Sequence, residues 1–264
     1  MKLKSKLLII AGSDSSGGAG IQADIKTATS LGVYAMTAIT AITAQNTTGV
    51  KSIVPVPPKE IFNQISFSVQ DIKPNSVKIG MLQNVGVIKE VIKAIKKYKL
   101  KNIIIDPVMV AKGGHRLISN SSINYLRKKL LPYALLVTPN IPEAETLIKK
   151  RIQTLEDVIK AGKEILKFGP KFVLIKGGHT NKSFIEDVLI SKNNIKIFKN
   201  KKIKTKNTHG TGCTLSSAIA SFISKNYNMN ESCRRSIQYV HKAILLNPKF
   251  GRGHGPINHM ALLN

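Results

Sequence analysis

The sequence lacks tryptophan and has little cysteine: Cys213 and Cys233 are the only two cysteines among its 264 residues. Because they form no CxxC pattern, the sequence excludes a disulfide framework and predicts no zinc site, as is typical of a reduced, cytoplasmic protein. With only 5% aromatic residues, we expect no platform for stacking nucleic-acid bases. The apolar runs are too short to cross a bilayer, so neither a membrane helix nor a signal peptide is expected.

Acidic residues are also scarce, with 14 Asp and Glu against 41 Lys and Arg, which gives a formal net charge of +27. Such a charge raises the hypothesis of nucleic-acid binding, which a salt-sensitive RNA shift without turnover would support. The lysines, however, are spread over the whole chain, mostly on the polar sides of amphipathic segments. Lys, Asn and Ile are abundant together, as an A/T-biased coding sequence would produce. We therefore interpret the charge as compositional and expect no specific nucleic-acid partner.

The sequence does contain a regular alternation of short apolar strands with helical patterns. One helical pattern places Val85, Ile88, Val91, Ile92 and Ile95 on a single face. The alternation predicts an α/β fold of three layers, α/β/α, with a mostly parallel central sheet in one domain spanning 1–264. Strands are expected at 7–11, 34–41, 76–79, 103–105, 135–137 and 172–175, helices at 20–31, 58–69, 85–98, 154–168, 212–225 and 230–246, and an edge hairpin at 184–203.

Polar and glycine-rich motifs follow the predicted strands. In an open parallel sheet, ligands bind at the carboxyl ends of the strands. For Asp106 and Glu143 we expect metal or substrate contacts, while the capping of helices or the fixing of turns is the alternative. The motifs lie at 12–20, 80–83, 106–114, 140–145 and 176–179, and five of the 14 acidic residues lie in or beside them: Asp14, Asp24, Asp106, Glu143 and Glu145.

The run H-G-T-G-C-T at 209–214 precedes an apolar helical pattern and places Gly210, Thr211 and Gly212 where a helix begins. The first N–H groups of a helix have no internal partner and the dipole is positive there, so such a terminus binds phosphate. Cys213 falls in the same turn, where a thiolate is favoured. Ordinary packing is the alternative, because a Gly-x-Gly before a helix is common.

The loop at 12–20 leads into G-x-G-x-x-A, the dinucleotide fingerprint, at 18–23. No acidic residue follows about 20 positions later, and the loop lacks the Lys and Ser/Thr of a P-loop, so both nucleotide motifs are excluded. We expect the loop to shape a substrate pocket with Asp24 facing it, the alternative being a solvated Asp24. Lys176 precedes two glycines and can reach a nucleotide phosphate, unless it is one more surface lysine.

Taken together, these motifs resemble the hydroxymethylpyrimidine/phosphomethylpyrimidine kinases of thiamine biosynthesis, which belong to the ribokinase-like superfamily. The resemblance covers essentially the whole chain. Its motifs, in order, are A-G-S-D-S-S-G-G-A-G-I-Q-A-D at 11–24, G-M-L at 80–82, D-P-V-M at 106–109, T-P-N-x-x-E-A at 138–144, K-G-G-H at 176–179, H-G-T-G-C-T at 209–214 and G-H-G-P at 253–256.

The resemblance implies an enzyme that transfers phosphate from ATP to 4-amino-5-hydroxymethyl-2-methylpyrimidine and then converts the monophosphate to the diphosphate. It also implies Mg²⁺ and a homodimer. The residues it implies are Gly210, Thr211, Gly212 and Cys213 around the transferred phosphoryl group, Lys176, Thr211 and Asn140 for ATP, Glu143 and Asp106 for Mg²⁺, and Gln45, Asp24, Val108, Met81 and Gly12 for the pyrimidine.

Cys213 departs from most sugar kinases of the superfamily, which have Asp as base at this position. The resemblance implies that its thiolate takes the hydroxymethyl proton, with a pKa lowered toward the operating pH. A base is less essential if the transition state is loose. The loop at 111–116 is expected to close over the substrate, with a static surface turn as the alternative.

Pyridoxal kinase is the closest enzymatic rival, since it shares the fold and the ATP chemistry. Cys213 in place of Asp, together with the loop at 12–24, favours the pyrimidine. A fused thiamine phosphate synthase is not expected, because the chain ends soon after Gly255 and Pro256.

Overall fold

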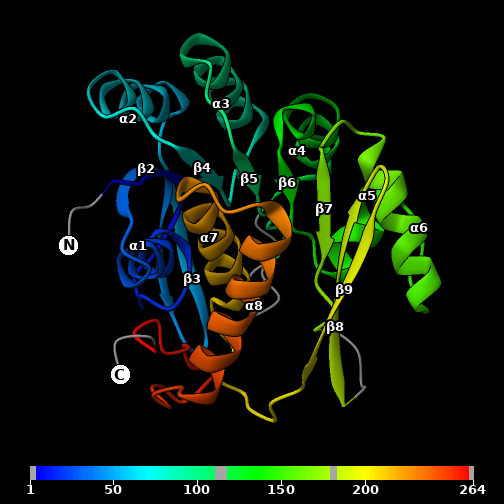
Figure 1. The fold of residues 1–264 in the computed structure, drawn as a ribbon. Coiled ribbons are helices and arrows are strands. Elements are labelled where there is room, and N and C mark those ends of the chain that lie inside the picture. The colour runs from blue at the N-terminus through cyan, green and yellow to red at the C-terminus, as the bar shows by residue number, and fades with distance from the viewer. Residues whose placement is uncertain (1–3, 111–117, 179–182, 262–264) are drawn as a thin grey trace.

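A computed structural model describes residues 4–110, 118–178 and 183–261, and in this part of the chain the centre of the fold is one nine-stranded sheet (Figure 1). Strands β2, β1, β4, β5, β6 and β7 run parallel, while β3 at one edge and β8 and β9 at the other are antiparallel to their neighbours. The order across the sheet is β3 (Gly49–Pro55), β2 (Tyr34–Asn46), β1 (Lys6–Asp14), β4 (Ser76–Ile79), β5 (Ile103–Ile105), β6 (Leu136–Val137), β7 (Phe172–Ile175), β8 (Phe184–Ser191) and β9 (Ile195–Lys201).

Helices cover both faces of the sheet, which confirms the predicted three-layer fold (Figure 1). Each face carries its own apolar core, because successive strand residues point to opposite sides. In β1, Leu8 and Ile10 belong to one core, and Leu7 and Ile9 to the other. One layer holds α1 (Gly20–Ser30), α7 (Thr211–Ser224) and α8 (Met229–Leu245), and the other holds α2 (Pro58–Asp71), α3 (Val85–Tyr98), α4 (Asn120–Tyr125), α5 (Ile141–Ile148) and α6 (Leu155–Leu166).

The two edges of the sheet differ in how well the sequence predicts them. The hairpin expected at 184–203 is present as β8 and β9. At the other edge, β2 continues past the expected end at 41, turns at Thr47 and Thr48, and pairs with β3. The polar run at 45–49 predicts a turn after the strand at 34–41, yet Gln45 and Asn46 still belong to β2 and pair with β3. That error matters for function, because it places Gln45 on a strand.

The structure also contains helices that were not predicted, namely α5 and the short helical run of α4, η1 (Leu126–Leu130) and η2 (Leu131–Tyr133). For α5 a local signal exists: Asn140 accepts the N–H of Glu143, and the Glu143 carboxylate accepts the N–H of Asn140. This capping box is readable as Asn-x-x-Glu before an apolar run. The capping role proposed as the alternative for Glu143 is therefore present in the structure.

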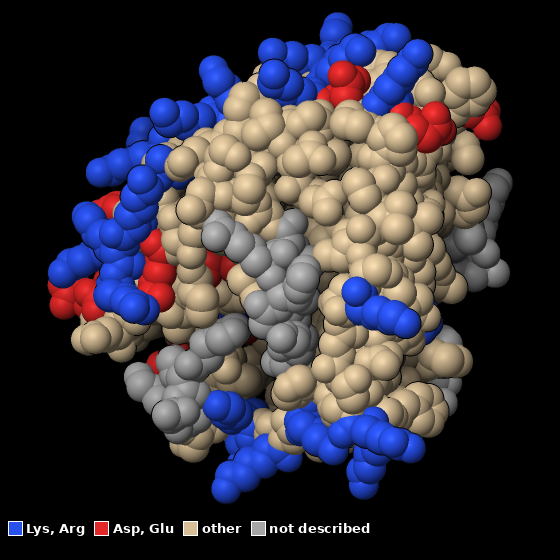
Figure 2. All heavy atoms as spheres, turned by 180° about the vertical axis from the view of Figure 1, so that it is seen from behind, with Lys and Arg blue, Asp and Glu red and all other residues tan. Residues whose placement is uncertain are grey.

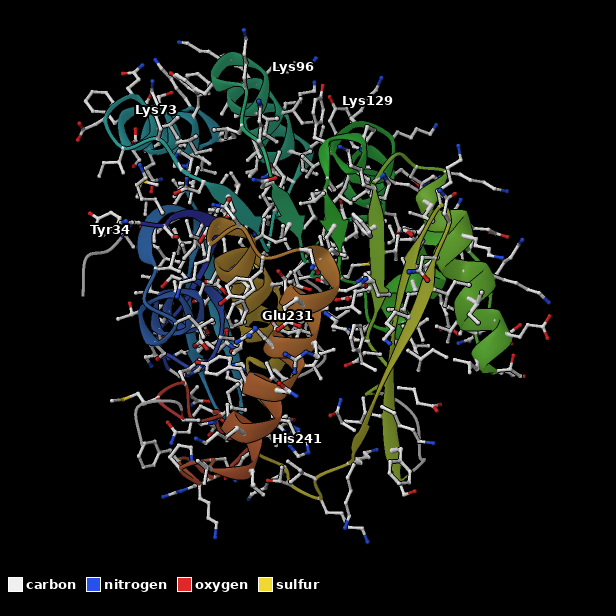
Figure 3. All side chains as sticks on the ribbon, in the orientation of Figure 1. Tyr34, Lys73, Lys96, Lys129, Glu231 and His241 are labelled. Atoms are coloured by element: carbon white, nitrogen blue, oxygen red, sulfur yellow. The ribbon has the colours of Figure 1, made fainter. Side chains whose placement is uncertain are left out.

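Basic side chains gather in several places on the surface. Figure 2 shows them along the upper edge, on the left side and at the lower end, and Figure 3 shows Lys73, Lys96 and Lys129 at the end of the molecule that carries α2, α3 and α4. In the described part of the chain, none of the helices is long and apolar enough to cross a membrane. The compositional origin of the charge stays a prediction.

Candidate active site

The carboxyl ends of the parallel strands open into a cavity of about 900 Å³. Every site residue predicted above lines this cavity except Asp24. The loop at 111–116, which was expected to close over the site, lies outside the described residues. The lining residues that were predicted are Gly12, Gln45, Met81, Asp106, Val108, Asn140, Glu143, Lys176, Gly210, Thr211, Gly212 and Cys213.

One part of the cavity wall is built by the start of α7. Gly210 has a φ of +79°, and a Cβ atom there would overlap the carbonyl oxygen of Gly18, so both conformation and close approach require glycine. The N–H of Thr211 makes a long contact of 3.4 Å with Thr208. Within the described residues, the N–H groups of Gly212 and Cys213 have no acceptor. These amides can bind an anion in the cavity.

Lys176 supplies the positive side chain beside these amides. A Cβ atom on Gly212 would lie 3.3 Å from its ammonium nitrogen Nζ, which in turn lies 2.8 Å from Asp106 Oδ1 and 3.8 Å from Glu143 Oε2. Burial opposes the charge on Lys176, but the two carboxylates outweigh it and raise the pKa of this ammonium. Lys176 therefore remains a cation and is not one more surface lysine.

The carboxylates that flank Lys176 have different electrostatic surroundings. Burial and the neighbouring charge of Asp106 raise the pKa of Glu143 to about 7, although Lys176 opposes the shift. For Asp106, burial is outweighed by Lys176 and Lys78, which lower its pKa. No group of three or more His, Cys, Asp or Glu side chains that could hold a metal occurs among the described residues. Two carboxylates with hard oxygen donors nevertheless fit Mg²⁺, which usually keeps several waters and binds largely through substrate phosphates.

Cys213 lines the cavity, as expected, but its protonation state differs from the expectation. Burial raises the pKa of the thiol to about 11, and the negative charges of Asp24 and Asp106 add to this, whereas Lys78 opposes it. The prediction of a lowered pKa at the helix start was wrong, because loss of solvation and two nearby carboxylates outweigh the helix dipole. Cys213 is therefore a neutral thiol near pH 7.

Asp24 does not face the cavity. It is completely buried, and its carboxylate binds Lys78 Nζ at 2.6 Å and Ser217 Oγ at 2.6 Å. The structure thus corrects the expectation that Asp24 lines the substrate pocket, since both its oxygens are used inside the protein. Its partner Lys78 does line the cavity and was missed. A lysine inside the apolar strand Ser-Val-Lys-Ile was the available signal, because such a buried charge requires a partner.

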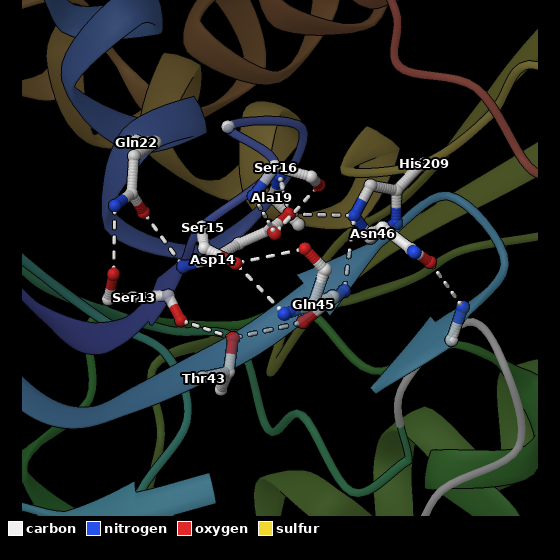
Figure 4. Close-up of polar contacts among 12 residues, drawn as sticks. Ser13, Asp14, Ser15, Ser16, Ala19, Gln22, Thr43, Gln45, Asn46 and His209 are labelled. Atoms are coloured by element: carbon white, nitrogen blue, oxygen red, sulfur yellow. Dashed lines mark hydrogen bonds and ion pairs between the residues drawn. The ribbon is translucent and has the colours of Figure 1, made fainter. Parts of the chain in front are cut away.

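A polar network elsewhere in the cavity wall joins three lining residues (Figure 4). Asp14 Oδ2 lies 2.8 Å from His209 Nε2, whose other neighbour is the side chain of Gln45 at 3.3 Å. Asp14 also accepts the N–H of Ser16 and of Ala19, so it holds the glycine-rich loop in place. The motif carrying His209 was identified from sequence, but the role of its histidine was not.

Asp187 is another lining residue that was not predicted. It is buried on β8, and its Oδ1 accepts the N–H of Gly177, directly after Lys176. Burial raises the pKa of this carboxyl to about 6, although the Gly177 N–H and Lys176 oppose the shift. Nothing in the local sequence distinguishes it from an ordinary strand Asp.

Asp187→Asn is expected to raise the free energy of unfolding by about 1–2 kcal/mol at pH 8. A folded-state pKa of about 6 against 3.8 means that Asp187 stabilises the fold below pH 3.8, and that this contribution is lost as the pH rises through 6. The substituted amide keeps an acceptor for the Gly177 N–H, and its unpaired NH₂ offsets part of the gain. Urea unfolding at pH 4 and pH 8 checks this, and a gain of equal size at both pH values would contradict it.

A family model described as phosphomethylpyrimidine kinase matches residues 14–258. The chain belongs to this family. It is 43% identical over 257 residues to the hydroxymethylpyrimidine/phosphomethylpyrimidine kinase of Bacillus subtilis, covering 97% of this chain and 95% of the relative. It is also 43% identical to the thiamine biosynthesis bifunctional protein of Geobacter sulfurreducens, of which it spans only 52%. The chain thus matches about half of that longer relative.

Solved structures of this family and of pyridoxal kinases have a similar fold. The phosphomethylpyrimidine kinase of Clostridium difficile superposes with a TM-score of 0.82 at 44% identity, covering 91% of this chain and all of that one. The pyridoxal kinase of Bacillus subtilis, solved as an ADP complex, superposes with a TM-score of 0.92 at 36% identity, and 98% of each chain is covered. The fold is therefore ribokinase-like, as the sequence motifs predicted.

Proposed function

We propose that this kinase phosphorylates 4-amino-5-hydroxymethyl-2-methylpyrimidine with ATP and then phosphorylates the monophosphate to the diphosphate, as in thiamine biosynthesis. The observation that carries the proposal is that the acceptor-free amides of Gly212 and Cys213 share one cavity with the amide of Gln45. The first can bind a migrating phosphoryl group and the second can bind a pyrimidine edge. Family membership and the names of the relatives support the same assignment.

The chain's own residues act on the phosphoryl group mainly by position and charge. The amides of Gly212 and Cys213 point at charge that develops on the transferring oxygens, and they need no reorganisation when the reaction occurs. Lys176 lies beside them, held by Asp106, and contacts ATP phosphates in this proposal. Thr211 and Asn140 line the same cavity and complete the nucleotide side.

Asp106 and Glu143 are the residues that would hold Mg²⁺, directly or through water. When bound, the ion neutralises charge that spreads over the phosphate oxygens. Asn140 positions Glu143 through the capping box. Its side-chain oxygen already accepts the Glu143 N–H, so its two side-chain atoms are not both available to the site. The proposal includes a homodimer, which rests on the family resemblance, and a cytoplasmic location, which rests on the cysteine content.

On the acceptor side, Gln45 hydrogen-bonds the pyrimidine edge while Met81 and Val108 provide apolar contact to the ring. Gly12 allows this arrangement, because a Cβ atom there would lie only 2.7 Å from Met81 Cε. Asp24 contributes through Lys78 rather than by touching the ring. The neutral thiol of Cys213 lines the same space and shapes it.

Gln45→Leu is expected to raise the KM for the pyrimidine alcohol by roughly 5- to 150-fold, because polar groups of the ligand would lose their partners at a cost of about 1–3 kcal/mol. The KM for ATP should stay the same, since the nucleotide contacts are assigned to Lys176 and the start of α7. Steady-state kinetics with each substrate varied in turn measures this. An unchanged KM for the pyrimidine would refute the contact.

Pyridoxal is the second candidate acceptor, which the ADP-bound pyridoxal kinase at 36% identity favours. Purified protein should be incubated with ATP, Mg²⁺ and either alcohol, and the products identified by mass spectrometry. We expect mono- and diphosphate from the pyrimidine and a higher kcat/KM for it than for pyridoxal. Absence of a phosphorylated pyrimidine, with pyridoxal phosphate formed instead, would overturn the proposed function.

A further inference from the structure

The side chain of Gln45 lies between two polar atoms whose hydrogen-bonding roles are already fixed (Figure 4). One is His209 Nε2 at 3.3 Å, and the other is Thr43 Oγ1 at 3.4 Å. A primary amide offers a donor at one end and an acceptor at the other, and the two ends have nearly the same shape. The hydrogen-bonding roles of His209 and Thr43 therefore determine which of them the amide oxygen of Gln45 faces and which of them its nitrogen faces.

His209 presents a protonated nitrogen, with no lone pair, toward Gln45. Its Nε2 lies 2.8 Å from Asp14 Oδ2, and Asp14 is almost completely buried. Burial opposes ionisation, but hydrogen bonds from His209 and Ser16 outweigh it and lower the pKa of Asp14, so this group is a carboxylate. A carboxylate can only accept, and the proton of this contact must therefore reside on Nε2. An amide nitrogen facing Nε2 would set two donors against each other, whereas an amide oxygen can share the proton with Asp14 in a three-centre bond.

Thr43 presents an acceptor. Its hydroxyl has one proton, which it donates to the carbonyl oxygen of Ser13 at 2.8 Å. Only lone pairs remain for Gln45, and an amide oxygen facing them would set two acceptors together. Turning the amide of Gln45 by 180° from the rotamer in Figure 4 resolves both conflicts, because its oxygen then shares the His209 proton with Asp14 and its NH₂ donates to Thr43.

We propose that Asp14, His209 and Thr43 lock the Gln45 amide in this single orientation, and that the lock selects a ring with an amino group beside an unprotonated nitrogen. The inference rests on the proposed function, in which Gln45 contacts the ring edge. An aminopyrimidine needs an acceptor for its amino group and a donor for its ring nitrogen. The 4-oxo counterpart carries a carbonyl beside an N–H and needs the reverse order, which only a freely turning amide could supply.

Asp14, His209 and Thr43 act as positioning residues through Gln45. Their test is therefore the ratio of kcat/KM values for two rings and not the activity itself. The kcat/KM is measured for 4-amino-5-hydroxymethyl-2-methylpyrimidine and for 5-hydroxymethyl-2-methylpyrimidin-4-one with each variant. We expect the unchanged enzyme to favour the amino ring by about 100-fold or more. His209→Leu removes the donor and should lower that preference by about tenfold or more. His209→Gln, which can place an amide N–H near Asp14, should restore most of it.

Ser15→Ala is the matched control. The Ser15 hydroxyl binds the backbone N–H and C=O of Gln45 at 2.9 Å each and leaves the side-chain amide untouched, so both rings should be affected alike and the ratio should not change. If His209→Leu does not fold, Thr43→Val, which keeps the shape and removes the acceptor, should also lower the preference.

The outcomes separate the two claims. A preference that stays at its starting value in both His209→Leu and Thr43→Val, while the amino ring is still phosphorylated, overturns the orientation inference and leaves the proposed function intact. Failure of the unchanged enzyme to phosphorylate the amino ring overturns the proposed function, and the inference with it. A preference lost in His209→Leu and regained in His209→Gln supports both.

Discussion

Gly212→Ala is expected to lower kcat by about 10²- to 10³-fold while the protein stays folded. The added methyl group would lie 3.3 Å from Lys176 Nζ and 3.6 Å from Asp106 Oδ2, in the space that the proposed function assigns to the phosphoryl group. The backbone at this position is helical, so alanine causes no conformational strain. The loss should appear in kcat for both alcohols, as measured by coupled ATPase and product assays.

Gly49→Ala is a matched control for this substitution. A Cβ atom at Gly49 meets no atom within 4 Å, and the residue does not line the cavity, so kcat should stay within about twofold of the unchanged enzyme. Thermal unfolding of both variants separates a blocked site from a damaged fold. Normal turnover by Gly212→Ala would remove the start of α7 from the reaction.

The kcat of the unchanged enzyme is expected to rise about tenfold per pH unit between about pH 7.5 and 9.5. The pKa of Cys213 is raised to about 11, so its thiolate fraction grows about tenfold per unit over this range. The raised pKa also makes the thiolate a stronger base, which offsets part of its small population. Cys213→Ala should lower kcat at pH 8 by about 100-fold and abolish the slope, while the Kd for ATP stays unchanged.

Two controls assign that slope to Cys213. Cys233→Ala removes the other thiol, which is buried on α8 away from the cavity, and should keep the slope. Glu143 titrates near pH 7, below the range tested, so its ionisation is largely complete before the slope is measured. A flat profile for the unchanged enzyme, or equal turnover after Cys213→Ala, would exclude the thiolate as proton acceptor.

The order of strands and helices, except α4 and α5, could be predicted because the strands of the sheet and the longer helices carry clear local signals. The strand at 76–79 and the helix at 85–98 have the predicted bounds, since apolar periodicity and flanking polar residues define both ends. The β2–β3 hairpin was missed because a run of Gln, Asn and Thr suits a loop as well as a tight turn. Pairing between edge strands, which local composition does not encode, decided the outcome.

At the candidate site, too, some features could be predicted from the sequence and others could not. Motifs at strand ends could be assembled into one cavity, because the topology of a parallel sheet brings those ends together. The direction and ionisation of individual side chains could not be predicted, since these depend on partners far along the chain. Asp24 points into the protein because Lys78 and Ser217 bind its carboxylate there. The pKa of Cys213 is raised because the thiol is buried beside two carboxylates.

The contact between Gly18 and Gly210 has a consequence for biosynthesis. These glycines come from opposite ends of the chain, and each loop is completed only by the other: the backbone of Gly210 lies against the carbonyl of Gly18, and His209 reaches across to Asp14. All nine strands precede α7 in the chain, so most of the sheet can pair while translation is still under way, but the part of the cavity wall built by the start of α7 forms only after that segment has left the ribosome.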